Sequence, residues 1–142
     1  DYEDQSGKIL AEGLERHGSE IPSLVVVPDE VEAIKGALAA FCASGVHLVL
    51  VTGGTGLSRR DVTPEAVEPL LDRRLPGVEE ALRSYGQSRN PHAMLSRSLA
   101  GVIGSTLVVC LPGSPLACEE AMSALFPSLL HALEVLSEEE LV

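Results

Sequence analysis

Apolar positions along the chain alternate between two patterns, one typical of helices and one typical of buried strands. Apolar residues three or four positions apart predict helices, and the second of these helices has Asp29 as its expected N-cap with Glu32 three positions later. Short uninterrupted apolar runs predict buried strands. The predicted helices cover residues 6–17, 30–43, 65–72, 76–85, 91–95 and 116–136. The predicted strands cover residues 24–27, 46–51, 101–104 and 106–111.

Strands separated by helices predict an α/β fold with three layers, a mostly parallel sheet with helices on both faces. A length of 142 residues fits a single domain, residues 1–142. In such sheets, ligands bind beyond the carboxyl ends of the strands. Loops at 28–29, 52–63 and 112–115 each follow a predicted strand, so we expect them to meet in one crevice.

The loop after the second predicted strand is rich in glycine. Residues 52–56 read Thr-Gly-Gly-Thr-Gly, and residues 60–66 read Arg-Asp-Val-Thr-Pro-Glu-Ala. Thr63 is the expected N-cap of the next helix, with Pro64 at its first position. The glycine spacing fits a tight strand-to-helix connection as well as a phosphate site. The arginine and aspartate that open the second stretch favour the phosphate site.

The chain carries a formal net charge of −11 at pH 7, which argues against nucleic acid or an anionic membrane as a partner. Seven of the ten basic residues lie between Arg59 and Arg97, and all seven are arginine. An anionic ligand is therefore expected near this part of the chain, although solvated helix positions explain most of these arginines equally well. Hydrophobic residues make up 45% of the chain and aromatic residues 3%, which predicts an aliphatic core.

The remaining composition predicts a cytoplasmic protein. No apolar run has the length of a membrane span. The three cysteines, Cys42, Cys110 and Cys118, match no zinc or disulfide spacing and are expected to stay reduced. The four histidines show no ligand spacing, and His92 is the one we weigh most as a ligand contact.

Five short motifs together resemble a known family. They are Asp-Gln-Ser-Gly at 4–7, Val-Pro-Asp-Glu at 27–30, the two stretches of the glycine loop, and Leu-Pro-Gly-Ser-Pro at 111–115. In this order, along essentially the whole chain, they resemble the molybdopterin adenylyltransferase family of the MogA/MoaB type, which includes the G domain of gephyrin. The family places a central strand before the first helix. The resemblance therefore implies that this strand is missing from the sequence or belongs to a longer polypeptide.

The resemblance implies a reaction in which molybdopterin attacks the α-phosphorus of ATP and pyrophosphate leaves, with Mg²⁺ assisting. Asp29 and Asp61 match the family's functional aspartates and are expected to act in catalysis or to hold Mg²⁺. The resemblance also implies a homotrimer, and a molybdenum insertase or a fused cofactor-synthesis domain as partner. The residues expected to bind molybdopterin or ATP are Ser6, Gly7, Gly53, Gly54, Thr55, Gly56, Arg60, Pro112, Gly113 and Ser114.

Other interpretations stay open on the sequence. One is a non-catalytic module of the same fold that holds molybdopterin or serves as a protein scaffold. Another is a nucleotide-processing enzyme of the competence/damage-inducible type. The plain structural alternatives for single residues are Asp29 as a helix cap, Asp61 as an ion-pair partner of Arg59 or Arg60, Ser6 and Gly7 as a helix start, and residues 112–115 as a turn.

Overall fold

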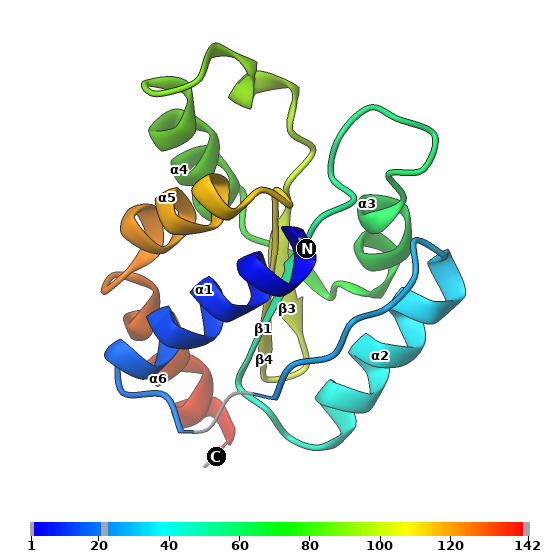
Figure 1. Ribbon diagram of the computed structural model, residues 1–142. Helices are drawn as coiled ribbons and strands as arrows, with labels where there is room; N and C mark the ends of the chain where they lie inside the picture. The colour runs from blue at the N-terminus through cyan, green and yellow to red at the C-terminus, as the bar shows by residue number, and fades with distance from the viewer. Residues whose placement is uncertain (1, 21–22, 141–142) are drawn as a thin grey trace.

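The computed structural model describes residues 2–20 and 23–140 (Figure 1). Its α-helices are α1 (Tyr2–Arg16), α2 (Val31–Ala43), α3 (Thr63–Val67), α4 (Pro76–Gln87), α5 (Pro115–Leu125) and α6 (Leu129–Glu140). Short 3-10 helices are η1 (Glu68–Leu70) and η2 (Pro91–Leu95). The strands are β1 (Leu48–Thr52), β2 (Arg73–Arg74), β3 (Ala100–Ile103) and β4 (Thr106–Leu111).

The strands form one sheet in the order β1-β4-β3-β2. β1 and β4 run parallel, with Leu48 opposite Leu107 and Thr52 opposite Leu111. β3 pairs antiparallel with both β4 and β2, and β3 and β4 form a hairpin where the sequence predicted strands at 101–104 and 106–111. Because β1 and β4 are parallel, their carboxyl ends lie at the same edge of the sheet.

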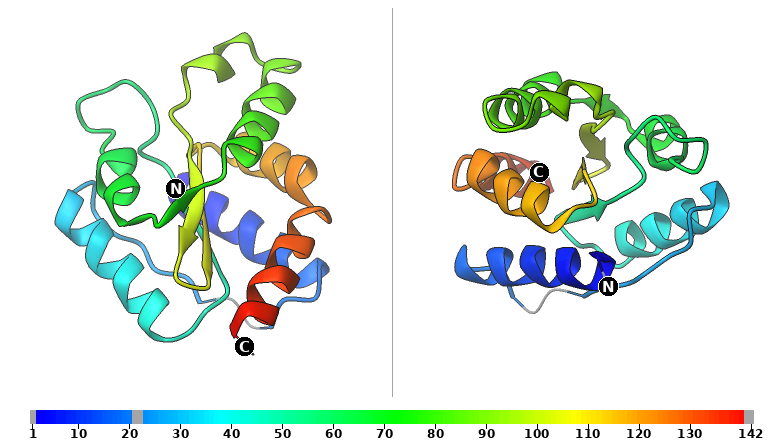
Figure 2. Two further views of the ribbon diagram at one scale, coloured as in Figure 1. Left: turned by 180° about the vertical axis from the view of Figure 1, so that it is seen from behind. Right: turned by 45° about the horizontal axis from the view of Figure 1, so that its top comes forward.

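β4 lies at the centre of the protein, and all six of its residues are buried. Its side chains alternate between two cores, as strand geometry requires. Leu107, Val109 and Leu111 pack with residues of α1, α4, α5 and α6, whereas Val108 and Cys110 pack with residues of α2 and α3. Helices thus cover both faces of the sheet (Figures 1 and 2), which confirms the predicted α/β class and its three layers.

Two predictions about the sheet are wrong within the described residues. The sheet has one parallel and two antiparallel pairings, so it is mixed rather than mostly parallel. Residues 24–27 form no strand, and the side chains of Leu24, Val25 and Val26 are 59%, 56% and 61% exposed. A β-branched run favours an extended backbone, but a strand also needs a hydrogen-bonded neighbour. β1 pairs only with β4 and stands at the edge of the described sheet, and residues 24–27 take no part in its pairing.

Helix ends also differ from the predictions. α2 begins at Val31 with Glu30 as its N-cap residue, and no side chain caps it, so the predicted cap by Asp29 is wrong. α3 begins at Thr63 with Val62 as its N-cap residue, so the predicted cap by Thr63 is wrong. The Thr63 hydroxyl donates instead to the carbonyl of Gly53.

The predicted long C-terminal helix is interrupted at Pro127 and forms α5 and α6. Proline lacks an N–H and disfavours helical angles in the residue before it. Phe126 accordingly has φ −107° and ψ 144°. Among residues 2–20 and 23–140, no helix combines the length and the apolar character needed to cross a membrane.

We predict that Gly101→Ala lowers the free energy of unfolding by roughly 1–3 kcal/mol, because the added Cβ would overlap the carbonyl oxygen of Arg73 and the side chain of Leu71. Gly36→Ala in α2 is the control, since a Cβ there meets nothing within 4 Å. It should raise the free energy of unfolding by about 0.5–1 kcal/mol. Urea unfolding followed by circular dichroism measures both, and equal midpoints for the two variants would contradict the packing at Gly101.

Candidate functional site

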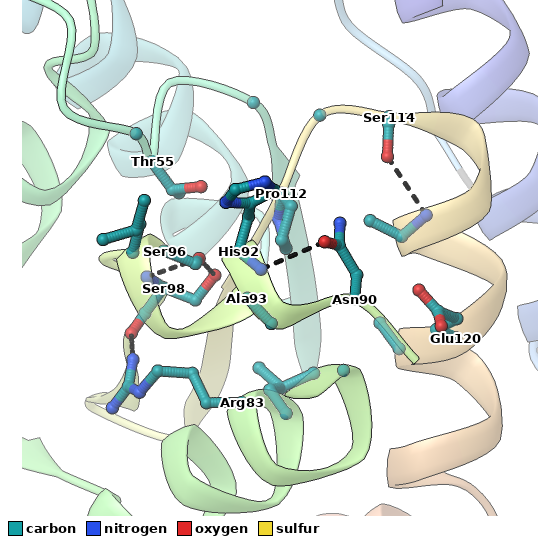
Figure 3. Close-up of a pocket in the computed structure, with 18 of the residues that line it drawn as sticks. Thr55, Arg83, Asn90, His92, Ala93, Ser96, Ser98, Pro112, Ser114 and Glu120 are labelled. Atoms are coloured by element: carbon teal, nitrogen blue, oxygen red, sulfur yellow. Dashed lines mark hydrogen bonds between the residues drawn. The ribbon is translucent and has the colours of Figure 1, made fainter. Parts of the chain in front are cut away.

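A cavity of about 570 Å³ opens at the edge of the sheet where β1 and β4 end (Figure 3). Its first wall is the glycine loop, residues 53–57, together with Asp61. Its second wall is the loop after β4, residues 112–114. The third wall comes from α4, η2, α5 and residues 96 and 98 ahead of β3.

The two loops after the strands are tied to each other. The N–H of Gly53 donates to the carbonyl of Leu111 at 2.9 Å, and the hydroxyl of Thr52 donates to the carbonyl of Pro112 at 2.8 Å. A Cβ on Gly113 would lie 3.1 Å from the Cα of Gly53. Glycine therefore allows the two backbones to approach closely at the floor of the cavity.

The glycine loop is hydrogen-bonded from behind. The carbonyl oxygens of residues 53–56 accept, in order, from the hydroxyl of Thr63 at 2.8 Å, the N–H of Thr63 at 3.1 Å, the N–H of Arg97 at 2.7 Å and the Nε of Arg97 at 2.8 Å. Four consecutive carbonyl groups are thus directed toward these two residues. Gly53 and Gly54 have φ values of +96° and +69°, which glycine adopts at little cost.

This arrangement leaves a row of backbone donors on the other side of the loop. In a trans peptide the C=O and the following N–H point in opposite directions, so the N–H groups of residues 54–57 face away from Thr63 and Arg97. Within the described residues none of these four N–H groups donates a hydrogen bond. All four residues line the cavity. Successive free N–H groups of this kind form a concave site for an anion.

Asp61 is the carboxylate beside this row. Its Oδ2 accepts a hydrogen bond from the N–H of Ser58 at 2.9 Å, which closes the tip of the loop. A Cβ on Gly56 would come within 2.9 Å of the same oxygen, so glycine at 56 allows the carboxylate to lie against the loop. Asp61 therefore holds a turn and lines the cavity at the same time.

Arg83 of α4 brings a guanidinium to the third wall. Its Nη1 donates to the carbonyl of Ser98 at 2.8 Å, and its Nη2 lies 3.7 Å from Oε1 of Glu79 (Figure 3 shows the first of these). Glu79 is only 5% exposed and accepts further hydrogen bonds from Arg74 at 2.9 and 2.8 Å and from the N–H of Ala100 at 3.0 Å. The Arg83 side chain is thus held on the cavity wall by a buried carboxylate and a main-chain oxygen.

Other polar groups complete this wall. The hydroxyls of Ser96 and Ser98 lie 2.8 Å apart, and Oδ1 of Asn90 accepts from the N–H of His92 at 3.0 Å. Glu120 of α5 adds a carboxylate. Figure 3 shows these groups distributed around the same cavity as Thr55 and Ser114. The cavity therefore combines an anion site on one wall with hydrogen-bonding groups for a polar ring or sugar on the others.

The cysteine side chains have a structural rather than a catalytic role. Cys42, Cys110 and Cys118 are all free, and the last two are buried. Burial raises the pKa of the Cys110 thiol to about 12 and also raises that of Cys118. Neither group is a thiolate at neutral pH, so neither is available as a nucleophile.

Most of the residues predicted to bind a ligand line the cavity. These are residues 53–56, Asp61 and residues 112–114. The Ser114 hydroxyl also accepts from the N–H of Ala117 at 3.2 Å and caps α5. The alternative of a simple turn at 112–115 thus explains part of the role of Ser114, but not its position in the cavity wall.

Four residues that the sequence predicted for the site do not line the cavity, namely Ser6, Gly7, Asp29 and Arg60. Ser6 is fully buried and donates to the carbonyl of Gly113 at 2.7 Å, so it supports the second loop from behind. Asp29 is exposed ahead of α2, and Arg60 is exposed at the tip of the glycine loop. The structure brings Asp61 to the cavity but not Asp29.

The sequence interpretation missed several residues of the site. Arg83, Ser96, Ser98 and Glu120 line the cavity without belonging to any motif that we singled out. Arg97 bonds the glycine loop from the segment ahead of β3. The concentration of arginines between residues 59 and 97 was the available signal, but it did not separate the two site arginines from the solvated ones.

Comparisons with known proteins agree with this architecture. Residues 1–131 match the family described as "Probable molybdopterin binding domain". A molybdenum cofactor biosynthesis bifunctional protein of Chlorobaculum tepidum is 44% identical over 133 residues, which are 94% of this chain and 43% of that protein. A molybdopterin adenylyltransferase of Helicobacter pylori is 36% identical over 138 residues, 95% of this chain and 78% of that protein.

A solved structure gives the same result. The crystal structure of a molybdopterin biosynthesis protein from Mycobacterium abscessus superposes with a TM-score of 0.91 at 43% identity, covering 96% of this chain and 87% of that one. The chain spans less than half the length of the bifunctional relative. On the family match and these relatives, the chain belongs to the family of molybdopterin-binding domains found in molybdenum cofactor biosynthesis proteins.

Proposed function

We propose that the chain is a molybdopterin adenylyltransferase that uses Mg²⁺-bound ATP. The observation that carries the proposal is the row of free backbone N–H groups at residues 54–57, which line the cavity. The name of the Helicobacter pylori relative supports the same activity. A cavity of about 570 Å³ also has a size common for small-molecule sites.

The proposed reaction joins two polyanions. An oxygen of the molybdopterin phosphate forms a bond to the α-phosphorus of ATP, and the bond from that phosphorus to the bridging oxygen of the β-phosphate breaks. The electron pair leaves with pyrophosphate. Because the substrates repel each other, catalysis depends mainly on positioning them and on neutralising charge. Backbone donors suit this task, since they offer partial positive charge without a counter-charge.

Arg83 supports the same proposal from the third wall. Its guanidinium is held by Glu79 and by the carbonyl of Ser98, so it needs little rearrangement to meet an anion. The hydroxyls of Ser96 and Ser98 are suited to hydrogen-bond a pterin or a ribose. We assign the glycine loop to phosphate binding and this wall to the polar remainder of a substrate.

Asp61 is the residue that we propose to contact Mg²⁺ or the reacting phosphates. Mg²⁺ prefers oxygen ligands and usually keeps one or two carboxylates together with substrate phosphates. No cluster of three or more His, Cys, Asp or Glu side chains suited to a metal occurs in the described part of the chain, so the substrate would have to supply the other ligands. Bound in this way, Mg²⁺ would supply charge neutralisation at the phosphates, and Asp61 would hold it beside the glycine loop.

Several expectations from the family stay predictions. The assignment of Asp29 to catalysis or Mg²⁺ depends on the resemblance alone, as does that of Ser6, Gly7 and Arg60 to substrate binding. The homotrimer also depends on the resemblance, whereas a cytoplasmic location and a single domain over residues 1–142 are predictions from composition and length. The bifunctional relative is consistent with a fused partner domain, and a molybdenum insertase remains a proposed partner.

The first test is the release of pyrophosphate from Mg²⁺-bound ATP by the purified protein, with and without molybdopterin. Release that depends on molybdopterin supports the proposal. A folded protein that binds molybdopterin and releases no pyrophosphate would instead be a binding module. Release from a nucleotide substrate without any pterin would favour the nucleotide-processing alternative.

We predict that Asp61→Asn lowers molybdopterin-dependent pyrophosphate release by about 100-fold or more. The fold should persist, because asparagine has the same shape and its amide oxygen accepts the Ser58 N–H equally well. Asp72→Asn is the matched control: Asp72 accepts the N–H of Gly104 at 2.7 Å and is not among the lining residues. Full activity in Asp61→Asn would remove Asp61 from the mechanism.

We also predict that Gly54→Ala weakens binding of Mg²⁺-bound ATP by about tenfold or more, measured by calorimetry. Gly54 has φ +69°, and an added Cβ would overlap the hydroxyl of Thr63. Gly104→Ala is the control, because Gly104 has φ +59° in a hairpin turn where a Cβ meets nothing within 4 Å. Unchanged ATP affinity in Gly54→Ala would mean that the loop serves only as a connector.

A further inference from the structure

Arg97 lies in the segment ahead of β3, and its contacts all lead to the glycine loop and the helix that follows it. Its N–H donates to the carbonyl of Thr55 at 2.7 Å, and its Nε donates to the carbonyl of Gly56 at 2.8 Å. Its Nη2 donates to the carbonyl of Asp61 at 2.7 Å. Nη1 and Nη2 reach the carboxylate of Glu65 in α3 at 2.5 and 3.3 Å. One arginine therefore ties residues 55, 56 and 61 of the loop to the first turn of α3.

We propose that Arg97 is a positioning residue that holds the glycine loop in the conformation that presents its N–H groups to a phosphate. The inference rests on the proposed function for the identity of the ligand, but the restraint on the loop stands on geometry alone. Fixing the carbonyls of Thr55 and Gly56 fixes the direction of the next two N–H groups, because both groups belong to the same planar peptides. The main-chain N–H of residue 97 holds the Thr55 carbonyl whichever side chain stands there. Among the described residues, the Gly56 carbonyl accepts only from the Arg97 side chain, so loss of that side chain releases the Gly56 peptide and the N–H of Leu57.

Arg97 does not act by contacting the ligand. It is absent from the residues that line the cavity, and its side chain already directs Nε and both Nη atoms to acceptors on the loop and α3. Glu65 supplies a counter-charge, and its hydrogen bond from Arg97 lowers the pKa of the Glu65 carboxyl. The guanidinium is thus committed to the protein itself.

The shape of the guanidinium matters more than its charge. The side chains of Arg97 and Glu65 are 34% and 50% exposed, and an ion pair of this exposure contributes little by itself. The planar group, however, places donors toward Gly56, Asp61 and Glu65 at once. A lysine ammonium is a point charge on a flexible stem and does not reproduce this fork.

The loop carries its own reporter for this restraint. Arg59 and Arg60 lie exposed at its tip, between Ser58 and Asp61, and both are sites for trypsin. Trypsin requires a segment that opens into an extended form. Loss of the restraint by Arg97 should therefore accelerate cleavage after Arg59 and Arg60, whether or not a ligand is present.

The test compares Arg97→Gln and Arg97→Lys with wild type and with Arg73→Gln, a matched loss of an exposed arginine in β2. Calorimetry measures the affinity for Mg²⁺-bound ATP, mass spectrometry follows tryptic cleavage at residues 59 and 60, and thermal unfolding checks the fold. In Arg97→Gln we expect affinity to fall and cleavage to accelerate by about tenfold or more each, with Tm within a few degrees of wild type. Arg97→Lys should stay close to Arg97→Gln, and Arg73→Gln should match wild type.

Three results would overturn the proposal. Wild-type affinity and cleavage in Arg97→Gln would show that the loop keeps its conformation without Arg97. Full rescue by Arg97→Lys would show that charge alone matters. Weaker affinity with unchanged cleavage would place Arg97 in direct contact with the ligand. If wild type itself fails to bind Mg²⁺-bound ATP, the proposed function fails, while the cleavage rates still decide whether Arg97 restrains the loop.

Discussion

Parallel pairing of β1 with β4 is the constraint on which the candidate site depends. Because both strands run in the same direction, the chain leaves Thr52 and Leu111 at one edge of the sheet and forms two loops side by side. Burial maintains this register, since the residues of β4 face two cores alternately. A shift by one residue would turn every side chain of β4 toward the opposite core, where it does not fit. The geometry of the cavity is therefore a consequence of core packing.

The overall negative charge of the chain does not prevent an anion site at this edge. At ordinary ionic strength, repulsion from exposed carboxylates more than about 10 Å away is largely screened. The groups close to the site therefore determine whether an anion binds. At the glycine loop these are main-chain N–H groups, which add partial positive charge without needing a buried counter-ion. Asp61 is the exception on this wall, and a carboxylate beside a phosphate site is reasonable if a divalent cation lies between the two.

The sequence was sufficient where one local signal determined the structure. The apolar runs identified β1 and β4, and the glycines with Asp61 identified the loop that lines the cavity. It was misleading where a partner decides the outcome: residues 24–27 have strand composition but no neighbouring strand in the described sheet. Arg83 could not be found from sequence either, because only the fold shows that Glu79 and Ser98 hold it on the cavity wall.

The same distinction explains why Ser6 and Arg97 were harder to interpret than the glycines. Ser6 bonds the carbonyl of Gly113, and Arg97 bonds that of Gly56, each from the side of the loop away from the cavity. Thr63 does the same at Gly53. A residue that supports the loop is needed wherever the loop has this shape, just as a residue that contacts the ligand is. The sequence alone therefore does not separate the two roles. Such a residue restricts the glycine-rich loop to one conformation when the protein folds, before any ligand arrives. Donors that are ordered in advance bind an anion more tightly than mobile ones, because less conformational entropy is lost on binding.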